Sequence, residues 1–209
     1  MTIYALSTVQ GQSGVAIIRV SGPLAEEAIF KLTHKKLKPR MATLCKILNS
    51  KKEALDEAVV IFFEEKRSFT GESVAEFQTH GGEAIIRSVL RELSLIKGLR
   101  PAEPGEFTKQ AYLSGKINLV QAEGLGDLIS AQTEKQRQQA MMQYGDETSN
   151  KYLAWSKEIR QCLAYIEASI DFSDEDIPRD LLKGIKKISK KSSKNKYKSN
   201  KSSRKSSIC

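Results

Sequence analysis

Cysteine and histidine are scarce in this sequence, whose 209 residues include three cysteines and two histidines. Cys45, Cys162 and Cys209 lie far apart, and none belongs to a C-x-x-C pair or lies near a pair of histidines. This spacing argues against a structural zinc site and against a disulfide framework. It is typical of a protein that works in a reducing compartment.

Long hydrophobic runs and the familiar catalytic signatures are missing as well. No 18 consecutive residues are apolar, and no basic stretch followed by an apolar one opens the chain, so we expect a cytoplasmic protein without a membrane segment. The sequence has no G-x-x-x-x-G-K-[ST] phosphate loop and no G-x-S-x-G, H-E-x-x-H or G-x-G-x-x-G motif. Any site must therefore be assembled from scattered residues.

Acidic residues are absent from the C-terminal end of the chain. Residues 183–209 hold eleven of the 34 Lys and Arg and no Asp or Glu, whereas residues 1–182 hold 23 basic and 25 acidic residues. The net charge of +9 therefore comes from this end, and residues 1–182 carry −2. A segment dominated by Lys and Ser cannot bury a core, so we predict a disordered low-complexity tail over 183–209.

The rest of the chain divides into an α+β part and a helical part. Residues 1–116 alternate β-branched runs with amphipathic stretches, which predicts a mixed sheet with helices. The expected strands are 3–6, 15–20, 43–48, 58–63 and 74–79, and the expected helices are 23–32, 83–98 and 108–113. The second part, 117–182, has apolar residues at helical spacing, which predicts an all-α segment with a break at 144–146.

The segment 68–82 is the strongest candidate for a ligand site, because it sets a short strand between Gly71 and the pair Gly81-Gly82. Glu76 in this strand is either a solvent-facing carboxylate or an acceptor for the N–H groups of a heterocyclic ligand that the glycines allow to approach. His80 is a candidate general base, although a lone histidine before a tight turn is more often a hydrogen-bonded structural residue.

Two cations and one carboxylate elsewhere also have two interpretations. Arg19 is either an edge-strand side chain with its head in solvent or an inward arginine that pairs with a carboxylate or stacks on a flat ring. Lys116 either compensates a helix dipole or pairs with a ligand carboxylate. The N-terminus of the helix expected at 108–113 either receives an anionic group or, more simply, has Glu106 as its first-turn charge compensation. No metal site is expected, since the acidic cluster at 171–176 lacks the spacing of a calcium loop.

Together these segments resemble the beginning of the tRNA modification GTPase MnmE (TrmE) family. The resemblance runs from residue 2 to residue 177 and is carried by five motifs in the family's order. They are GVAIIRVSG at 14–22, FTGESVAE at 69–76 with HGG at 80–82, RPAEPGEFT at 100–108, KINLVQAE at 116–123 with DLI at 127–129, and IDFSDE at 170–175.

The resemblance implies that residues 1–116 are similar to tetrahydrofolate-binding aminomethyltransferase domains, form a homodimer and bind 5-formyltetrahydrofolate or a related one-carbon carrier. It implies that residues 117–182 are part of a helical domain. The family acts with an MnmG (GidA)-type flavoprotein on the wobble uridine of tRNA, at C5. Its folate-contacting positions carry over to Arg19, Glu76 and Lys116, and no catalytic residue is implied.

The sequence also departs from the family. The GTPase domain, which would use GTP, Mg and K, has no counterpart because the phosphate loop is missing, and the final Ser207-Ile208-Cys209 lacks the Gly-Lys of the family's C-terminal signature. We therefore expect no GTP hydrolysis from this chain, and a truncated or frameshifted gene would explain the change of composition near residue 185. The apolar stripe from Trp155 to Ile170 would then lack some packing partners.

Three other interpretations stay open. The chain could be a basic-tailed RNA-binding module without an enzymatic role, since eleven positive charges support salt-sensitive binding to phosphates. It could also be a non-functional fragment of a disrupted gene. A stand-alone one-carbon transferase is the least favoured, because no general acid–base constellation is complete within the chain.

Overall fold

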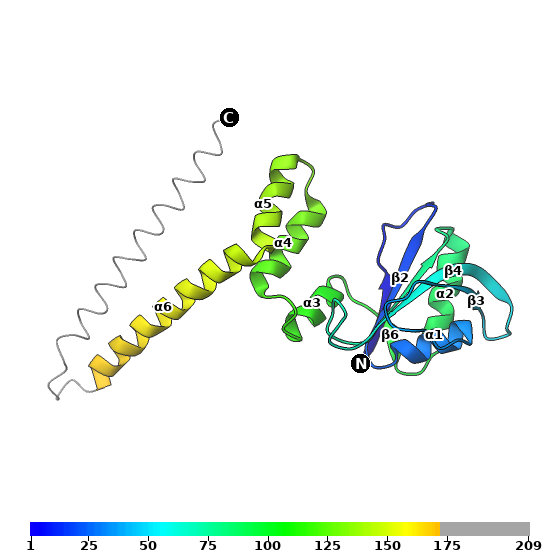
Figure 1. The fold of residues 1–209 in the computed structure, drawn as a ribbon, viewed down its shortest axis with the longest axis horizontal. Helices are drawn as coiled ribbons and strands as arrows, with labels where there is room; N and C mark the ends of the chain where they lie inside the picture. The colour runs from blue at the N-terminus through cyan, green and yellow to red at the C-terminus, as the bar shows by residue number, and fades with distance from the viewer. Residues whose placement is uncertain (172–209) are drawn as a thin grey trace. The chain divides into compact units, whose positions relative to one another are not determined.

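The computed structural model describes residues 1–171, drawn in colour in Figure 1. Its contacts divide the chain into two compact units, Met1–Ala122 and Glu123 onward. Each unit is therefore treated by itself. The predicted tail at 183–209 and the acidic cluster at 171–176 lie outside the described residues, apart from the backbone of Asp171.

The first unit is built on a six-stranded mixed sheet with the order β3-β4-β5-β2-β1-β6. Neighbouring strands are antiparallel except β1 and β6, which are parallel. The strands are β1 (Thr2–Leu6), β2 (Ala16–Ser21), β3 (Thr43–Leu48), β4 (Ala54–Phe63), β5 (Val74–Thr79) and β6 (Leu99–Pro101). The prediction of an α+β fold with a mixed sheet is confirmed.

Helices α1 (Ala25–Thr33) and α2 (Glu83–Ser94) pack on one face of this sheet and close a single core (Figure 1). Alternate strand residues enter that core, among them Ile18, Val20 and Phe77, all fully buried. Because successive strand side chains point to opposite faces, Arg19 and Glu76 belong to the other face. The third helix of the unit is α3 (Glu106–Leu113).

Several element boundaries differ from the sequence prediction, and α2 ends at Ser94 rather than near residue 98. β4 begins at Ala54, four residues before the expected start, because the charged turn after β3 is tight and pairing resumes at once. β6 was not among the expected strands, and α3 begins at Glu106 rather than at Thr108. For β4 and β6, pairing with another strand decides the boundary, which local propensity does not report.

The second unit is helical, as predicted. It begins within α4 (Leu119–Ser130) and continues with α5 (Glu134–Tyr144) and α6 (Asp146–Asp171). The predicted break at 144–146 is confirmed, since α5 ends at Tyr144 and α6 begins at Asp146. α5 opens with a capping box in which Thr133 and Gln136 exchange side-chain and backbone hydrogen bonds. No helix within residues 1–171 is long and apolar enough to cross a membrane.

The apolar stripe predicted on the last helix is exposed along much of its length. Ile159, Leu163 and Ile170 are each more than half exposed, as is Leu153 beside them. The stripe therefore contributes little to the core of the described helical unit.

Candidate functional site

Arg19 and Glu76 form an ion pair on the face of the sheet that α1 and α2 leave free. The two residues are direct partners in the antiparallel register of β2 and β5. Arg19 Nε and Nη2 both donate to Glu76 Oε1, at 2.9 and 2.7 Å. The side chains are 25% and 16% exposed, respectively. Because β2 is an inner strand, Arg19 is the inward, carboxylate-paired arginine and not an edge residue.

The geometry of this pair leaves one acceptor atom available. Both hydrogen bonds from Arg19 end on Oε1, and within residues 1–171 no hydrogen bond reaches Glu76 Oε2. A carboxylate oxygen accepts hydrogen bonds only, so Oε2 suits an N–H or O–H donor from outside the protein. The pair thus fixes the carboxylate and still offers part of it to a ligand.

Two phenylalanine rings flank the guanidinium of Arg19. Its Cζ lies 5.9 Å from the ring centroid of Phe69 and 5.5 Å from that of Phe107. Such distances give cation–π attraction and keep the guanidinium plane in place. Stacking on a flat ring was one of the interpretations of Arg19, and here the rings belong to the protein itself. Both phenylalanines stand in motifs that the sequence singled out, which was the available signal.

Lys116 contacts the loop that carries Phe69. Its Nζ donates to the carbonyl oxygen of Lys66, and no hydrogen bond or ion pair in the described chain joins it to Arg19 or Glu76. The structure therefore brings together two of the three predicted site residues directly. The third is connected to them indirectly, through the 66–71 loop that carries Phe69 and through α3, which carries Phe107.

Gly71 is required where this loop meets the end of α3. Its φ is +83°, and a Cβ there would lie 2.5 Å from Ser114 Oγ and 3.4 Å from Lys116 Cγ. Only glycine tolerates both the left-handed backbone and this approach. Ser114 Oγ donates to the carbonyl of Thr70 at 2.6 Å, which fixes the loop to α3.

A buried hydroxyl cluster joins β2, the 66–71 loop and α3. Ser21 Oγ donates to Gln110 Oε1 at 2.7 Å, and Thr70 Oγ1 lies 2.8 Å from Ser21 Oγ. Ser21 and Thr70 are fully buried, and buried polar groups stabilise a structure only when they are paired. The cluster therefore sets the positions of β2, the 66–71 loop and α3 relative to one another.

Arg100 and Glu106 anchor the start of α3. Arg100 Nη1 donates to Glu106 Oε2 at 2.8 Å, Nη2 donates to Oε1, and the same Oε2 accepts the Glu103 N–H at 2.8 Å. The hydrogen bonds from Arg100, with that from Glu103, lower the pKa of Glu106 to about 2. Glu106 was predicted as helix-dipole compensation. Its partner Arg100 was not predicted, although both lie in one motif.

His80 is a hydrogen-bonded residue at the end of β5, as the structural interpretation held. Its backbone N–H and its Nδ1 contact the two oxygens of Asp56, at 2.8 and 2.7 Å. Burial raises the pKa of Asp56, but the hydrogen bonds from His80 and Glu57 outweigh it and leave that pKa below its ordinary value. The close approach expected at Gly81 is made by the chain itself, since its N–H donates to Ser13 O at 3.1 Å.

The arrangement suits binding better than bond-breaking chemistry. A fixed arginine, two aromatic rings and a carboxylate oxygen can hold a flat heterocycle through its faces and its N–H edge. Among residues 1–171, no group of three or more His, Cys, Asp or Glu side chains is placed to hold a metal ion.

Comparison with known proteins gives the family. The model of the GTP-binding protein TrmE N-terminus matches residues 2–116, which is more than half of the chain, and the model of the MnmE helical domain matches residues 119–208. Every residue of the Arg19 site lies within the first match.

Individual relatives agree with these models. The chain is 48% identical over 183 residues to a tRNA modification GTPase MnmE of Parvibaculum lavamentivorans, a match that covers 87% of this chain and 42% of the relative. It is 47% identical over 180 residues to the mitochondrial 5-taurinomethyluridine-[tRNA] synthase subunit GTPB3 of Danio rerio, covering 86% of this chain and 36% of that protein. The chain thus spans less than half the length of these relatives. By its N-terminal and helical domains, the protein belongs to the tRNA modification GTPase MnmE (TrmE) family.

Proposed function

We propose that this chain supplies the folate-binding and dimer-forming module of a protein that modifies the wobble uridine of tRNA at C5. Its relatives are named as tRNA modification GTPases and as a tRNA synthase subunit for a modified uridine. In this proposal the chain works in the cytoplasm as a homodimer, with an MnmG (GidA)-type flavoprotein and tRNA as partners.

One observation carries the folate part of this proposal. The Arg19 guanidinium is held by Glu76 and flanked by Phe69 and Phe107, and no donor among residues 1–171 reaches Glu76 Oε2. A pterin ring has two flat faces and an edge of N–H groups, which these side chains complement.

Lys116 completes the set that we assign to 5-formyltetrahydrofolate or a related carrier. The folate tail ends in carboxylates, and an exposed ammonium pairs with them at little desolvation cost. When bound, the folate would supply the one-carbon unit, and the role of Arg19, Glu76 and Lys116 is to bind and orient it.

Calorimetric titration of the full chain with 5-formyltetrahydrofolate tests this proposal. We expect the dimer to bind folate. Arg19→Ala should weaken the affinity by at least about tenfold, because Arg19 contacts the other side chains of the site. His80→Ala is the matched control and should change the affinity by less than about threefold. A folded dimer that binds no folate would remove the proposal.

A further inference from the structure

Basic residues are concentrated in one stretch of the first unit. Residues 28–52 contain eight Lys and Arg and no Asp or Glu. The other residues of 1–122 contain nine Lys and Arg against thirteen Asp and Glu, so they carry −4 while 28–52 carry +8. An ordinary solvated surface mixes both signs, and this one segregates them.

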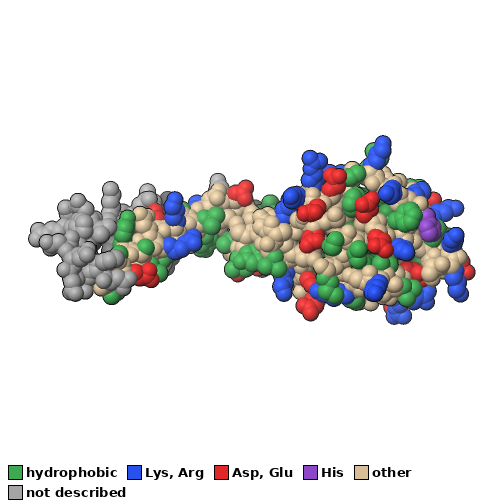
Figure 2. Space-filling view, turned by 90° about the horizontal axis from the view of Figure 1, so that it is seen from below, with side chains coloured by type: hydrophobic (Ala, Val, Ile, Leu, Met, Phe, Trp, Pro, Cys, Tyr) green, Lys and Arg blue, Asp and Glu red, His purple; other side chains and the backbone are tan. Residues whose placement is uncertain are grey.

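The eight cations lie along the β3 edge of the sheet. We name them the basic edge: Lys31 on α1, Lys35, Lys36, Lys38 and Arg40 on the α1–β3 loop, Lys46 on the edge strand β3, and Lys51 and Lys52 on the β3–β4 turn. All eight are exposed, and in the described chain none forms an ion pair with a carboxylate. In Figure 2, Lys and Arg side chains line the right-hand rim of the molecule.

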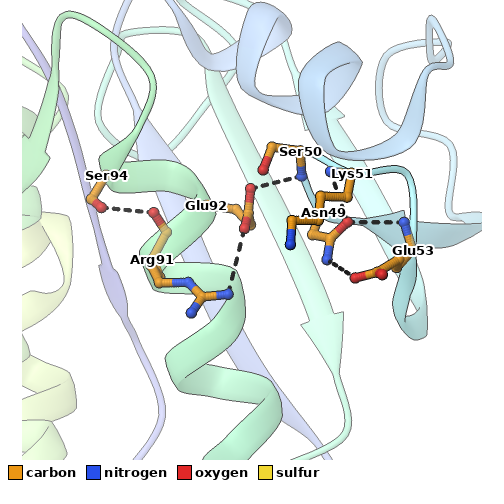
Figure 3. A network of polar contacts seen from close by, with 7 residues as sticks. All are labelled: Asn49, Ser50, Lys51, Glu53, Arg91, Glu92 and Ser94. Carbon is orange, nitrogen blue, oxygen red and sulfur yellow. Dashed lines mark hydrogen bonds and ion pairs between the residues drawn. The ribbon is translucent and has the colours of Figure 1, made fainter.

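The turn that carries Lys51 and Lys52 is held in place by α2 (Figure 3). Glu92, buried on α2, accepts the Ser50 N–H at 2.9 Å. Asn49 Oδ1 accepts the N–H groups of Lys51 and Glu53 at 3.0 and 2.9 Å. The backbone of the turn is therefore ordered, and its two lysines project from a fixed position.

The other end of the basic edge is tied to the body as well. The Arg40 N–H donates to Phe62 O at 2.7 Å, and the Lys35 N–H donates to Thr33 Oγ1 at 3.2 Å. Half-exposed Phe30 forms an edge-to-face pair with His34 beside these lysines, with ring centroids 6.1 Å apart. Ordered cations with exposed rings among them are the pattern of a nucleic-acid surface rather than of a flexible charged loop.

We propose that the basic edge binds the phosphate backbone of the tRNA substrate. The inference rests on the proposed function for the identity of the RNA, and it assigns that contact to the folded body instead of the C-terminal Lys/Ser segment. Six residues of β3 span about 20 Å, enough for several phosphates. Within residues 1–171 none of these cations pairs with a carboxylate, so they lose little on pairing with phosphates.

Anisotropy titrations of the full chain with bulk tRNA, at several KCl concentrations, test this assignment. The test variant replaces Lys36, Lys38, Lys46 and Lys51 with Gln. The matched control replaces Lys109, Lys135, Lys151 and Lys157 with Gln, which are also exposed. Both variants lose four positive charges and keep the C-terminal segment. Their net charge and the contribution of that segment to tRNA binding are therefore the same.

We expect the edge variant to bind tRNA at least about tenfold more weakly. The slope of log K against log salt should fall by about three to four, at nearly one for each of the four lost phosphate contacts. The control should lose less than about threefold. Equal losses in the two variants would overturn the proposal, as would an edge variant that loses binding to phosphatidylserine vesicles while keeping its affinity for tRNA.

Folate titration separates this proposal from the one on which it rests. The edge variant should bind 5-formyltetrahydrofolate as the unaltered chain does, because the basic edge shares no residue with Arg19, Glu76 or Lys116. A chain that binds no folate and yet shows the edge-specific loss of tRNA binding would refute the folate site alone.

Discussion

Arg19 places a guanidinium on an inner strand, and Glu76, directly opposite in the register, is the carboxylate that balances it. Replacing Glu76 with Gln removes the negative charge while nearly keeping the shape. We expect the free energy of unfolding to fall by about 1 to 2 kcal/mol, because a partly buried charge loses its partner. Urea unfolding measures this difference.

Glu83→Gln is the matched control for that change. Glu83 also pairs with an arginine, Arg87, but both side chains are more than half exposed. An exposed helix pair contributes less than about 0.5 kcal/mol, so this variant should unfold almost as the unaltered chain does. Equal losses of unfolding free energy in the two variants would show that the Arg19–Glu76 pair stabilises the fold no more than an exposed ion pair does.

Gly71 offers a second test on the scale of one residue. Gly71→Ala adds a Cβ that would lie 2.5 Å from Ser114 Oγ, whereas Gly115→Ala, at a similar φ of +72°, meets no atom within 4 Å. Each substitution costs about 1 kcal/mol of stability, because alanine disfavours the left-handed backbone conformation. We expect Gly71→Ala alone to lower the folate affinity measurably in calorimetry, because it displaces the loop that carries Phe69. Equal folate affinities of the two variants would contradict the role of the 66–71 loop in positioning Phe69.

Helix α3 brings Phe107 to Arg19, and its position depends on the Arg100–Glu106 pair. The folded-state pKa of Glu106, about 2, lies below its ordinary value of 4.5. The pair's contribution to stability is therefore complete above about pH 4.5 and is lost as the pH falls toward 2.

Glu106→Gln should remove this acid-dependent contribution. The difference in unfolding free energy between the unaltered chain and the variant should be constant above about pH 5 and should shrink between about pH 4.5 and 2. Arg100→Gln should produce the same profile, since it breaks the same pair. Urea unfolding at a series of pH values measures both, and a pH-independent difference would contradict the assignment.

At the scale of the element, local pattern predicted the type of nearly every helix and strand. The apolar face of 83–94 and the β-branched runs of β2 and β5 are strong local signals. The short β6 was missed because its strand character comes from pairing with β1, and Pro101 in it argues against a strand by itself.

The candidate site was only partly accessible from sequence. Residue chemistry and the family resemblance singled out Arg19, Glu76 and Lys116, but the contact between Arg19 and Glu76 joins positions 57 residues apart and depends on strand register. The contribution of Phe69, Phe107 and Arg100 to the site depends in the same way on how the 66–71 loop and α3 meet, which no local pattern reports.

On the scale of the molecule, two compact units imply two separable unfolding events. Trp155, the single tryptophan, lies in the second unit, so its fluorescence reports that unit alone. We expect Glu76→Gln to lower the unfolding midpoint of the β-rich unit, which circular dichroism measures. The unfolding midpoint measured by tryptophan fluorescence should not change. A common shift of both signals would show that the units unfold together.

Hydrogen exchange with and without 5-formyltetrahydrofolate is the sharpest test of a folate site at Arg19 and Glu76, because it locates the ligand as well as detecting it. We expect slower exchange in β2, β5, the 66–71 loop and residues 106–116, with no change at the β3–β4 turn. Protection confined to other segments, or none at saturating folate, would contradict the assignment of the Arg19–Glu76 site to folate.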